Sequence, residues 1–438
     1  MHIQSVKAFL RQPDLKIFTR GMRGEFLLYS GSTVMMQASK MLTILLAAKL
    51  LGPENTGWWN SLQPLLIYGG MLNFGVLNAM NRDVPYFTGR GNQEYAEYIR
   101  RVSWGITILT AVWASVFALV ASYFIRDPQV VQGALRALAV LLLFQQWYTY
   151  KSMLLISAIR FKLLSVQQLA QAVLYPLFSL GMAKLWGLNG FVLGQALVNL
   201  IVCVMMTALA HYDLRPIFDW KEVRRLVGVG FPIMAGGFLY DILRTLDRWV
   251  ILTFMGAVEV GYYTLAILVL QGITMLPSVV TAQFYPRMSK RFGETHSYQA
   301  LKPLLTTTLK VSIALILPFG LVVLLFTAPL TRWILPDYVT GIQAAIIVAV
   351  GVMVSRPVAG TAATFLNAVG KANWYMGVQI VMIPVQVALT VAAVKMGWGL
   401  DGVAAGVAVT QVVNMLGLVG LAVILLKRVP VEQRLDEH

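Results

Sequence analysis

Apolar stretches of about twenty residues recur along the chain from Phe26 to Leu426. As an α-helix, each stretch is long enough to cross a hydrocarbon core of about 30 Å. In lipid the backbone has to satisfy its own hydrogen bonds, so these stretches are predicted to be helical. Only 12% of the 438 residues are charged, whereas soluble proteins carry about 25%. The composition therefore excludes a soluble fold and predicts an all-α, polytopic membrane protein.

The limits of the apolar stretches predict about twelve transmembrane helices. The predicted helices cover residues 26–50, 58–80, 103–125, 134–157, 163–186, 189–211, 227–254, 260–284, 304–328, 340–367, 373–396 and 401–426. The first stretch is too long for the apolar region of a cleavable signal peptide, so it is expected to remain as a span.

The loops at the two ends of these helices differ in their basic residues. The poorer set of loops holds only Arg126, Arg136, Lys184, Arg332 and Lys395. By the positive-inside rule the richer set is cytoplasmic, and both termini are predicted to lie on that side. The net charge of +16 is thus explained by membrane topology, and nucleic acid is not expected as a partner.

The second half of the sequence repeats the first. Three pairs of segments align: 51–59 (LGPENTGWW) with 255–263 (MGAVEVGYY), 186–190 (WGLNG) with 398–402 (WGLDG), and more weakly 157–158 with 367–368. Tight packing of small residues also explains the glycines in these pairs and is compatible with a repeat. Each half contains six predicted helices, an even number, so the halves are predicted to be parallel repeats about an axis along the membrane normal.

The repeat divides the chain into predicted parts. Residues 25–212 and 227–427 are the N-terminal and C-terminal six-helix bundles, and a cytoplasmic linker, 213–226, joins them. A basic segment, 1–24, precedes them and is either cytoplasmic or lies along the lipid headgroups. A cytoplasmic tail, 428–438, follows them.

Four charged residues lie inside the predicted seventh span: Asp241, Arg244, Asp247 and Arg248. Each ionised group costs about 2.5–3.5 kcal/mol at the centre of a membrane helix, so charge inside a span indicates function by default. Asp241, Arg244 and Arg248 are spaced to share one helix face. The alternative is a buried ion network that only stabilises the helix.

The repeat relates these charges to others in the first half. The aligned glycines Gly52 and Gly256 are 204 residues apart. With this offset, Lys40 corresponds to Arg244 and Gln37 corresponds to Asp241. Five cations in spans, namely Lys40, Lys151, Arg244, Arg248 and Arg356, outnumber Asp241 and Asp247. An excess of positive charge predicts a cavity for an anion such as phosphate or pyrophosphate.

Further roles are assigned to polar residues of the spans. Asp241 and Asp247 are the candidates for coupling to protons or sodium, and Gln37, Gln146 and Asn73 are predicted to line the cavity. Helix packing explains each of the neutral residues equally well. Lys151 has the alternative of extending its ammonium group to the membrane surface.

The sequence lacks the residue patterns of an enzyme. Its four histidines fall in loops or termini, Cys203 is the only cysteine, and no glycine-rich phosphate loop opens a helix. No catalytic residue, metal site or cofactor is therefore predicted.

The segment LGPENTGWW, followed by GVLNAMNRDVPYFTGRGN and set in a repeat of six helices, resembles the polysaccharide flippases of the multidrug, oligosaccharidyl-lipid and polysaccharide (MOP) exporter superfamily. These flippases handle O-antigen and exopolysaccharide units. The resemblance implies transfer of an undecaprenyl-pyrophosphate-linked oligosaccharide from the cytoplasmic to the periplasmic leaflet, by alternating access through a cationic cavity. It implies a bacterial inner-membrane location, with Lys40, Arg244, Arg248 and Arg356 contacting pyrophosphate or acidic sugars. The expected partners are that glycan and membrane lipids, and a glycan polymerase complex is left open.

Three other functions remain as alternatives. Cation-coupled drug exporters of the same superfamily commonly place carboxylates within both bundles, whereas the first half here has no acid deep in a span. A membrane-embedded glycan polymerase or ligase is disfavoured by the repeat and the short outer loops. A flippase for the peptidoglycan precursor typically has two additional helices.

Overall fold

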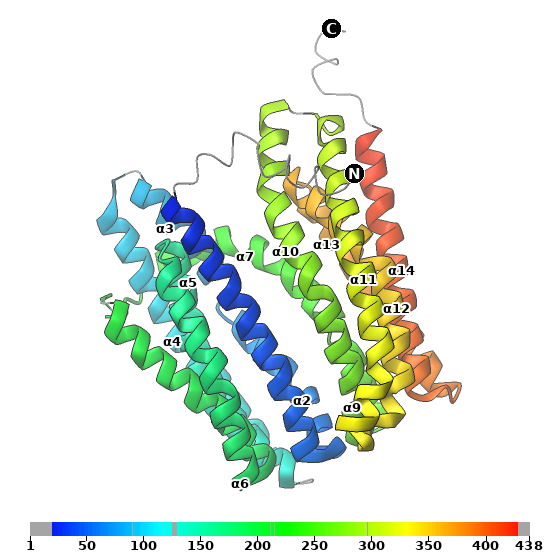
Figure 1. The fold of residues 1–438 in the computed structure, drawn as a ribbon. Helices are drawn as coiled ribbons and strands as arrows, with labels where there is room; N and C mark the ends of the chain where they lie inside the picture. The colour runs from blue at the N-terminus through cyan, green and yellow to red at the C-terminus, as the bar shows by residue number, and fades with distance from the viewer. Residues whose placement is uncertain are drawn as a thin grey trace. The chain divides into compact units, whose positions relative to one another are not determined.

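The computed structural model describes residues 20–89, 91–124, 129–210, 212–213, 215–295 and 297–427. Every regular element within these ranges is a helix (Figure 1), which confirms the all-α prediction. The elements are α2 (Arg20–Met71), α3 (Val76–Gly89), α4 (Gln93–Phe124), α5 (Gln129–Ser157), α6 (Phe161–Ala210), α7 (Trp220–Leu243), α8 (Leu246–Phe254), α9 (Ala257–Tyr262), α10 (Thr264–Thr295), η2 (Gln299–Leu301), α11 (Lys302–Ile334), η3 (Pro336–Gly341), α12 (Ile342–Ala368), α13 (Ala372–Lys395) and α14 (Gly399–Leu426). The predicted N-terminal segment and C-terminal tail lie mainly outside the described residues, as do Arg126 and the four histidines.

The described helices account for the predicted spans. Nine are long and apolar enough to cross a membrane, and the bent pair Trp220–Pro232 and Met234–Phe254, which turns by 52°, makes ten. Two of these helices contain a break in the helical backbone, α2 at Gly52 and α6 at Trp186 and Gly187, so each holds two predicted spans. The prediction of about twelve helices is confirmed.

The span predicted over 58–80 is not continuous. It ends with α2 and resumes as α3, because Phe74 and Gly75 adopt positive φ angles of 47° and 85°. A left-handed backbone is uncommon for a bulky residue such as Phe, so nothing in the sequence around Phe74 predicted this interruption.

The backbone repeats as the sequence does. Gly52 and Gly256, which align in the first pair of segments, have φ angles of 74° and 102°. Gly187 and Gly399, which align in the second pair, have φ angles of 57° and 59°. Because side chains disfavour these conformations, glycine at each position allows the same sharp break in both halves.

The contacts group the described chain into two compact units. Unit 1 contains the residues up to Ala47 together with Leu72–Phe231, and unit 2 contains Ala48–Met71 together with the residues from Pro232 onward. The division into bundles 25–212 and 227–427 stays a prediction. The segment Ala48–Met71 is thus grouped with helices of the second half, to which hydrogen bonds such as that from Asn60 to Thr264 join it.

Each unit is organised around one long helix. In unit 1, α5 packs against α3, α4 and α6, and in unit 2, α12 packs against α10, α11, α13 and α14. These two helices are the fourth and tenth predicted spans, which correspond in the repeat. Their buried faces contribute to apolar cores that include Tyr150 and Leu154 in unit 1 and Phe365 and Leu366 in unit 2.

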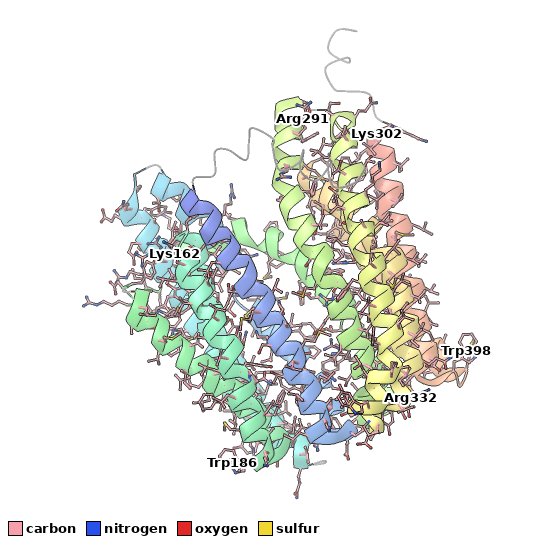
Figure 2. The ribbon with its side chains drawn as sticks, in the orientation of Figure 1. Lys162, Trp186, Arg291, Lys302, Arg332 and Trp398 are labelled. Atoms are coloured by element: carbon pink, nitrogen blue, oxygen red, sulfur yellow. The ribbon has the colours of Figure 1, made fainter. Side chains whose placement is uncertain are left out.

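The ends of the helices carry different side chains (Figure 2). In unit 2, Arg291 and Lys302 lie at one end and Arg332 and Trp398 at the other. In unit 1, Lys162 and Trp186 lie at opposite ends. Within each unit this agrees with the predicted separation of the basic loops, and the assignment of one end to the cytoplasm stays a prediction.

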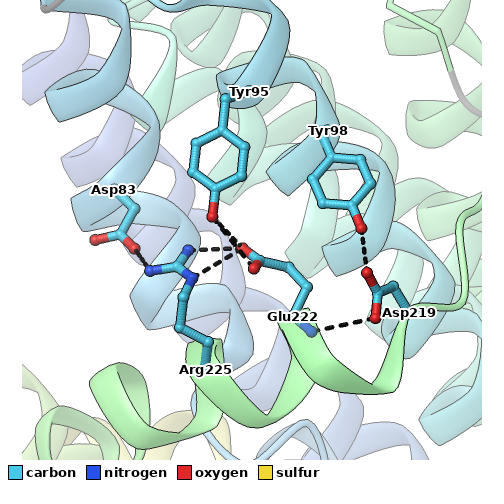
Figure 3. A network of polar contacts seen from close by, with 6 residues as sticks. All are labelled: Asp83, Tyr95, Tyr98, Asp219, Glu222 and Arg225. Atoms are coloured by element: carbon cyan, nitrogen blue, oxygen red, sulfur yellow. Dashed lines mark hydrogen bonds and ion pairs between the residues drawn. The ribbon is translucent and has the colours of Figure 1, made fainter.

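A network of hydrogen bonds and ion pairs connects the start of α7 to α3 and α4 within unit 1 (Figure 3). Arg225 pairs with Asp83 at 2.8 Å and with Glu222 at 2.7 Å. Tyr95 donates a hydrogen bond to Glu222, and Tyr98 donates one to Asp219.

Asp219 also caps α7, because its carboxylate accepts hydrogen bonds from two backbone N–H groups of the first turn, those of Lys221 and Glu222. The bond from Tyr98, reinforced by the backbone bonds, holds the pKa of the Asp219 carboxyl below its usual range. The network is therefore strongest when the carboxylates of Asp219 and Glu222 are both ionised.

Candidate functional site

The segment that carries the four intramembrane charges is not one continuous helix. The helix α7 ends at Leu243, Arg244 and Thr245 form a turn, and α8 begins at Leu246. The predicted common face of Asp241, Arg244 and Arg248 is therefore interrupted by this turn. The charges make different contacts on its two sides, although Arg244 and Arg248 remain in electrostatic range of each other.

The first group brings together two of the predicted cations. The guanidinium carbon of Arg244 lies 5.7 Å from the ring centre of Tyr240, and that of Arg356 lies 4.9 Å from the same ring centre. Both distances are within the range of cation–π attraction. We call Arg244 and Arg356 the arginine pair. It joins the end of α7 to the middle of α12.

The arginine pair has unused hydrogen-bonding capacity. Neither guanidinium group makes a hydrogen bond or an ion pair with any residue that the structure describes. Asp241 interacts with Arg244 electrostatically without forming an ion pair, and Tyr375 lies in electrostatic range of Arg356. A guanidinium group has five N–H donors in a planar fork that matches the oxygens of phosphate or carboxylate. The pair can therefore bind an anion without first breaking an internal bond.

The second group is buried and largely satisfied. Asp247 and Arg248 are 4% and 6% exposed. Arg248 donates from Nη1 to Oε1 of Gln63 at 2.9 Å, and the Asp247 carboxylate accepts from the backbone N–H of Arg248 and from the Tyr263 hydroxyl. Arg248 hydrogen-bonds to the segment Ala48–Met71 and lies in electrostatic range of Arg244. Its predicted role as a substrate contact stays a prediction.

The predicted cations of the first half lie in unit 1. Lys40 extends its ammonium group over the Tyr175 ring, 5.7 Å from its centre, and the neighbouring Gln37 is exposed. Lys151 is 1% exposed and makes no hydrogen bond or ion pair with a described residue. This burial does not fit the alternative in which Lys151 extends to the membrane surface.

The neutral candidates also lie in unit 1. Gln146 is buried in α5 at 1% exposure. Asn73 is buried at the break between α2 and α3, where its Oδ1 accepts the backbone N–H of Gly75 at 3.0 Å. Asn73 therefore has a local structural role in addition to any role in a cavity.

A chain of amides and hydroxyls fills the interface of α5 with α6. Tyr148 donates to Gln171 at 2.8 Å, Gln171 donates to Asn199 at 3.2 Å, and Asn199 donates to Gln145 at 2.8 Å. These side chains satisfy one another's hydrogen-bonding groups, which supports the helix-packing explanation for them.

Tyr240 and Tyr375 are the residues that sequence reasoning missed. Both are aromatic residues in apolar spans, where packing or an interfacial belt is the default explanation. The signal for Tyr240 was its position next to Asp241 in a charged segment. The contact with Arg356, more than a hundred residues away in sequence, had no signal.

Metal ligands do not gather in the part of the chain that the structure describes: no three His, Cys, Asp or Glu side chains there are placed to hold a metal ion. The chemistry available at the arginine pair is binding of an anion.

Comparisons with known proteins identify a family and a fold. A family model described as "Polysaccharide biosynthesis protein" matches residues 93–340, more than half of the chain. No curated protein matches the sequence.

Solved structures with the same fold are transporters. An inward-facing multidrug resistance MATE family transporter of the MOP superfamily has a TM-score of 0.75 at 17% identity, over 89% of this chain and 94% of that one. An outward-facing MATE family transporter has a TM-score of 0.64 at 15% identity, over 92% and 96%. A MOP superfamily transporter from Pyrococcus furiosus, whose title reports a binding pocket of reverse polarity, has a TM-score of 0.64 at 15% identity, over 91% and 95%. At such identities the likeness shows the fold alone.

The family model and the fold together confirm the resemblance in the sequence. The chain belongs to the polysaccharide biosynthesis protein family, and it is a multi-pass membrane protein whose fold is that of the MOP superfamily transporters.

Proposed function

We propose that this protein is a flippase that moves an undecaprenyl-pyrophosphate-linked oligosaccharide repeat unit from the cytoplasmic to the periplasmic leaflet of a bacterial inner membrane. Transport proceeds by alternating access through a cationic cavity. The family supports a glycan as the cargo, and the fold supports a transporter.

The observation that carries the proposal is the arginine pair. Two guanidinium groups lie on one tyrosine ring, and Asp241 is the acid in electrostatic range of Arg244, so the described cluster keeps an excess positive charge that an anion would offset inside a membrane. A pyrophosphate group presents several oxygens at once and allows each arginine a bidentate contact. A cationic drug offers no such oxygens and is repelled by the pair.

The membrane potential favours the proposed direction. Moving a negative charge outward across a membrane that is negative inside releases about 2.3 kcal/mol per charge per 100 mV. A pyrophosphate headgroup carried outward by the protein is therefore driven in the direction that the proposal requires.

The test is transport in liposomes. We would reconstitute the protein and follow the accessibility of a fluorescent undecaprenyl-pyrophosphate-linked oligosaccharide at each leaflet. Charge-assisted hydrogen bonds contribute about 1.5–3 kcal/mol each, so Arg244→Ala and Arg356→Ala are expected to weaken binding of the headgroup by about ten- to a hundredfold. Lys40→Ala is tested beside them as the equivalent position of the first half.

The matched control is Arg332→Ala, because Arg332 is exposed in the last turn of α11 at the end of the helix. It removes the same charge and is expected to leave transport unchanged. Movement of a cationic dye without movement of the glycolipid would assign the chain to the drug exporters. Equal loss of transport in Arg332→Ala would show that net charge, and not the arginine pair, controls the rate.

A further inference from the structure

A second tyrosine ring carries two guanidinium groups, at one end of unit 1. The guanidinium carbon of Arg100 lies 5.4 Å from the ring centre of Tyr212, and that of Arg160 lies 5.0 Å from the same ring centre. Both distances are within the range of cation–π attraction. We call these three residues the Tyr212 cluster. It joins α4, the turn between α5 and α6, and the residues that follow α6.

The Tyr212 cluster carries more positive charge than its acid offsets. Arg100 pairs through Nη1 with Glu97 at 2.9 Å, and its side chain is 15% exposed. Arg160 is exposed and donates from Nη1 to the backbone oxygen of Ala210 at 3.2 Å, and it makes no ion pair with a described residue. The Nη2 atoms of both arginines make no hydrogen bond with a residue that the structure describes. The cluster therefore has the charge and the free N–H donors to bind a phosphate group.

The linker that follows α6 lies along the start of α4, beside the cluster. Arg101 pairs with Asp213 at 3.7 Å and donates from Nε to the backbone oxygen of Arg215 at 3.0 Å. The backbone N–H of Ile217 donates to the carbonyl oxygen of Arg101 at 3.2 Å. The acid next to Tyr212 is thus paired with an arginine outside the cluster, and the excess charge of the cluster remains.

Large apolar side chains are exposed on the turn and the linker that adjoin the cluster. Ile159, in the turn, is 65% exposed, and Phe218 and Trp220, in the linker, are 55% and 65% exposed. Lys162 marks this end of unit 1, opposite Trp186 (Figure 2). Aromatic and apolar side chains beside basic ones are typical of the boundary between lipid headgroups and acyl chains. The surroundings of the cluster therefore favour a phosphate that belongs to a lipid.

The exposed isoleucine occupies a backbone position that suits glycine. Ile159 has a φ of 56°, in the left-handed region that a β-branched side chain disfavours. The second half contains a turn with the same pattern of backbone hydrogen bonds, in which Gly370 takes this position with a φ of 74° and Lys371 takes that of Arg160. Only the turn of the first half holds a bulky apolar side chain against its backbone preference. Strain of this kind indicates that the side chain has a role outside the turn.

We propose that the Tyr212 cluster is a binding site for an acidic phospholipid, with the lipid phosphate on Arg100 and Arg160 and an acyl chain against Ile159. Basic pockets between transmembrane helices bind lipid headgroups of this kind. By the predicted topology this end of unit 1 is cytoplasmic, and acidic lipids give that membrane surface a negative potential. The site lies in unit 1, whereas the arginine pair lies in unit 2, and it does not depend on the identity of the cargo.

The first test counts bound lipid. The purified full-length protein, freed of lipid in a mild detergent, is titrated with dioleoyl-phosphatidylglycerol and followed by native mass spectrometry. We expect one such lipid to bind about tenfold more tightly than dioleoyl-phosphatidylcholine, which has the same chains but no net charge. Arg160→Gln alone, and Arg160→Gln combined with Arg100→Gln, should lower the affinity for that lipid by about tenfold and about a hundredfold. Equal affinity for the two lipids would overturn the site.

The matched control is Arg224→Gln, because Arg224 is exposed in the first turns of α7 and interacts with no described residue. It removes the same charge and is expected to leave the affinity unchanged. An equal loss in this variant would show that net charge alone attracts the lipid. Displacement of the lipid by inorganic phosphate would assign the cluster to a soluble anion, and one-for-one displacement by the lipid-linked oligosaccharide would assign it to the cargo. Each of these three results would overturn the proposal.

The second test separates the apolar contact from the charges. Ile159→Gly relieves the left-handed backbone, so the melting temperature of the lipid-free protein should rise. The same substitution removes the contact with the acyl chain, so the affinity for dioleoyl-phosphatidylglycerol should fall by about three- to tenfold. A rise in stability with unchanged affinity would overturn the placement of the lipid on this turn. Neither test measures transport, so both results hold whether or not the proposed cargo is correct.

Discussion

Tyr240 lies between two positively charged side chains, Arg244 and Arg356, which repel each other. Its ring lies within 6 Å of both guanidinium carbons of the arginine pair. Each such contact contributes about 0.5–1 kcal/mol where the site is partly open to solvent. We therefore regard Tyr240 as a positioning residue that keeps Arg244 and Arg356 together before the anion arrives.

Two substitutions of Tyr240 distinguish the contribution of its aromatic ring from that of its hydroxyl group. Tyr240→Phe retains the aromatic face and is expected to bind pyrophosphate nearly as the native protein does. Tyr240→Leu removes both cation–π contacts, about 1–2 kcal/mol in total, and should weaken the affinity by about five- to thirtyfold. Titration calorimetry with inorganic pyrophosphate measures both variants, and equal affinity of the Leu and Phe variants would contradict the positioning role.

The charged residues of the site could be predicted from the sequence, but their contacts could not. Charge inside an apolar span is costly and therefore conspicuous, which is why Arg244, Arg356 and Lys40 could be named. What these charges contact depends on which helices pack together, so the contact of Tyr240 with Arg356 and the hydrogen bond from Arg248 to Gln63 had no sequence signal.

The start of the helix α7 is attached to its neighbours by ion pairs and hydrogen bonds. Arg225 joins it to Asp83 on α3 and to Glu222, and both carboxylates are buried, at 6% and 8% exposure. The start of α7 therefore depends on one guanidinium group that neutralises two acids.

Removal of that guanidinium leaves two buried carboxylates without a cation. Breaking a buried ion pair costs about 3–5 kcal/mol, and because the Arg225 side chain is 35% exposed we expect about 2–3 kcal/mol for Arg225→Met. Arg225→Lys should recover part of the loss, since one ammonium group can reach only one acid well. Thermal unfolding in detergent measures the three proteins, and a melting temperature of Arg225→Met equal to that of the native protein would show that the network is not stabilising.

The cap of the same helix should respond to pH. The bond from Tyr98 lowers the pKa of the Asp219 carboxyl, so its stabilisation is present above the unfolded value of about 3.9 and is lost as the pH falls through the folded value. Tyr98→Phe removes the main cause of the shift, so the folded pKa rises toward the unfolded value. The loss of stability should then be smaller and should be complete at a higher pH. Melting temperatures between pH 3 and 7 test this, with Asp219→Asn as the variant in which this pH dependence should disappear.

The existence and order of the helices were predictable because twenty apolar residues in lipid have few alternatives to a helix. The breaks were predictable only where glycine recurs in the repeat, as at Gly52 and Gly187. The interruption at Phe74 was missed, because a left-handed phenylalanine is stabilised by its surroundings and not by its own preference.

At the scale of the whole molecule, the repeat determines how the chain enters the membrane. If each half contains six helices, both halves begin on the same side of the membrane, so corresponding loops are expected to lie on the same side. Trp186 and Trp398 correspond at an offset of 212 and are 60% and 63% exposed at the breaks that start the last helix of each half. The predicted topology places both away from the cytoplasm.

Cysteine labelling tests this arrangement directly. In a Cys203→Ala background, Trp186→Cys and Trp398→Cys should both react with a membrane-impermeant maleimide added to intact cells. Lys162→Cys and Lys302→Cys, which lie at the other ends of their units (Figure 2), should react only after the membrane is made permeable. Labelling of Trp186→Cys and Trp398→Cys from opposite sides would show that the halves are inverted, and the equivalence of Lys40 with Arg244 at one depth would then be lost. Labelling of both from the outside supports parallel halves and keeps Lys40 and Arg244 at an equivalent depth in the membrane.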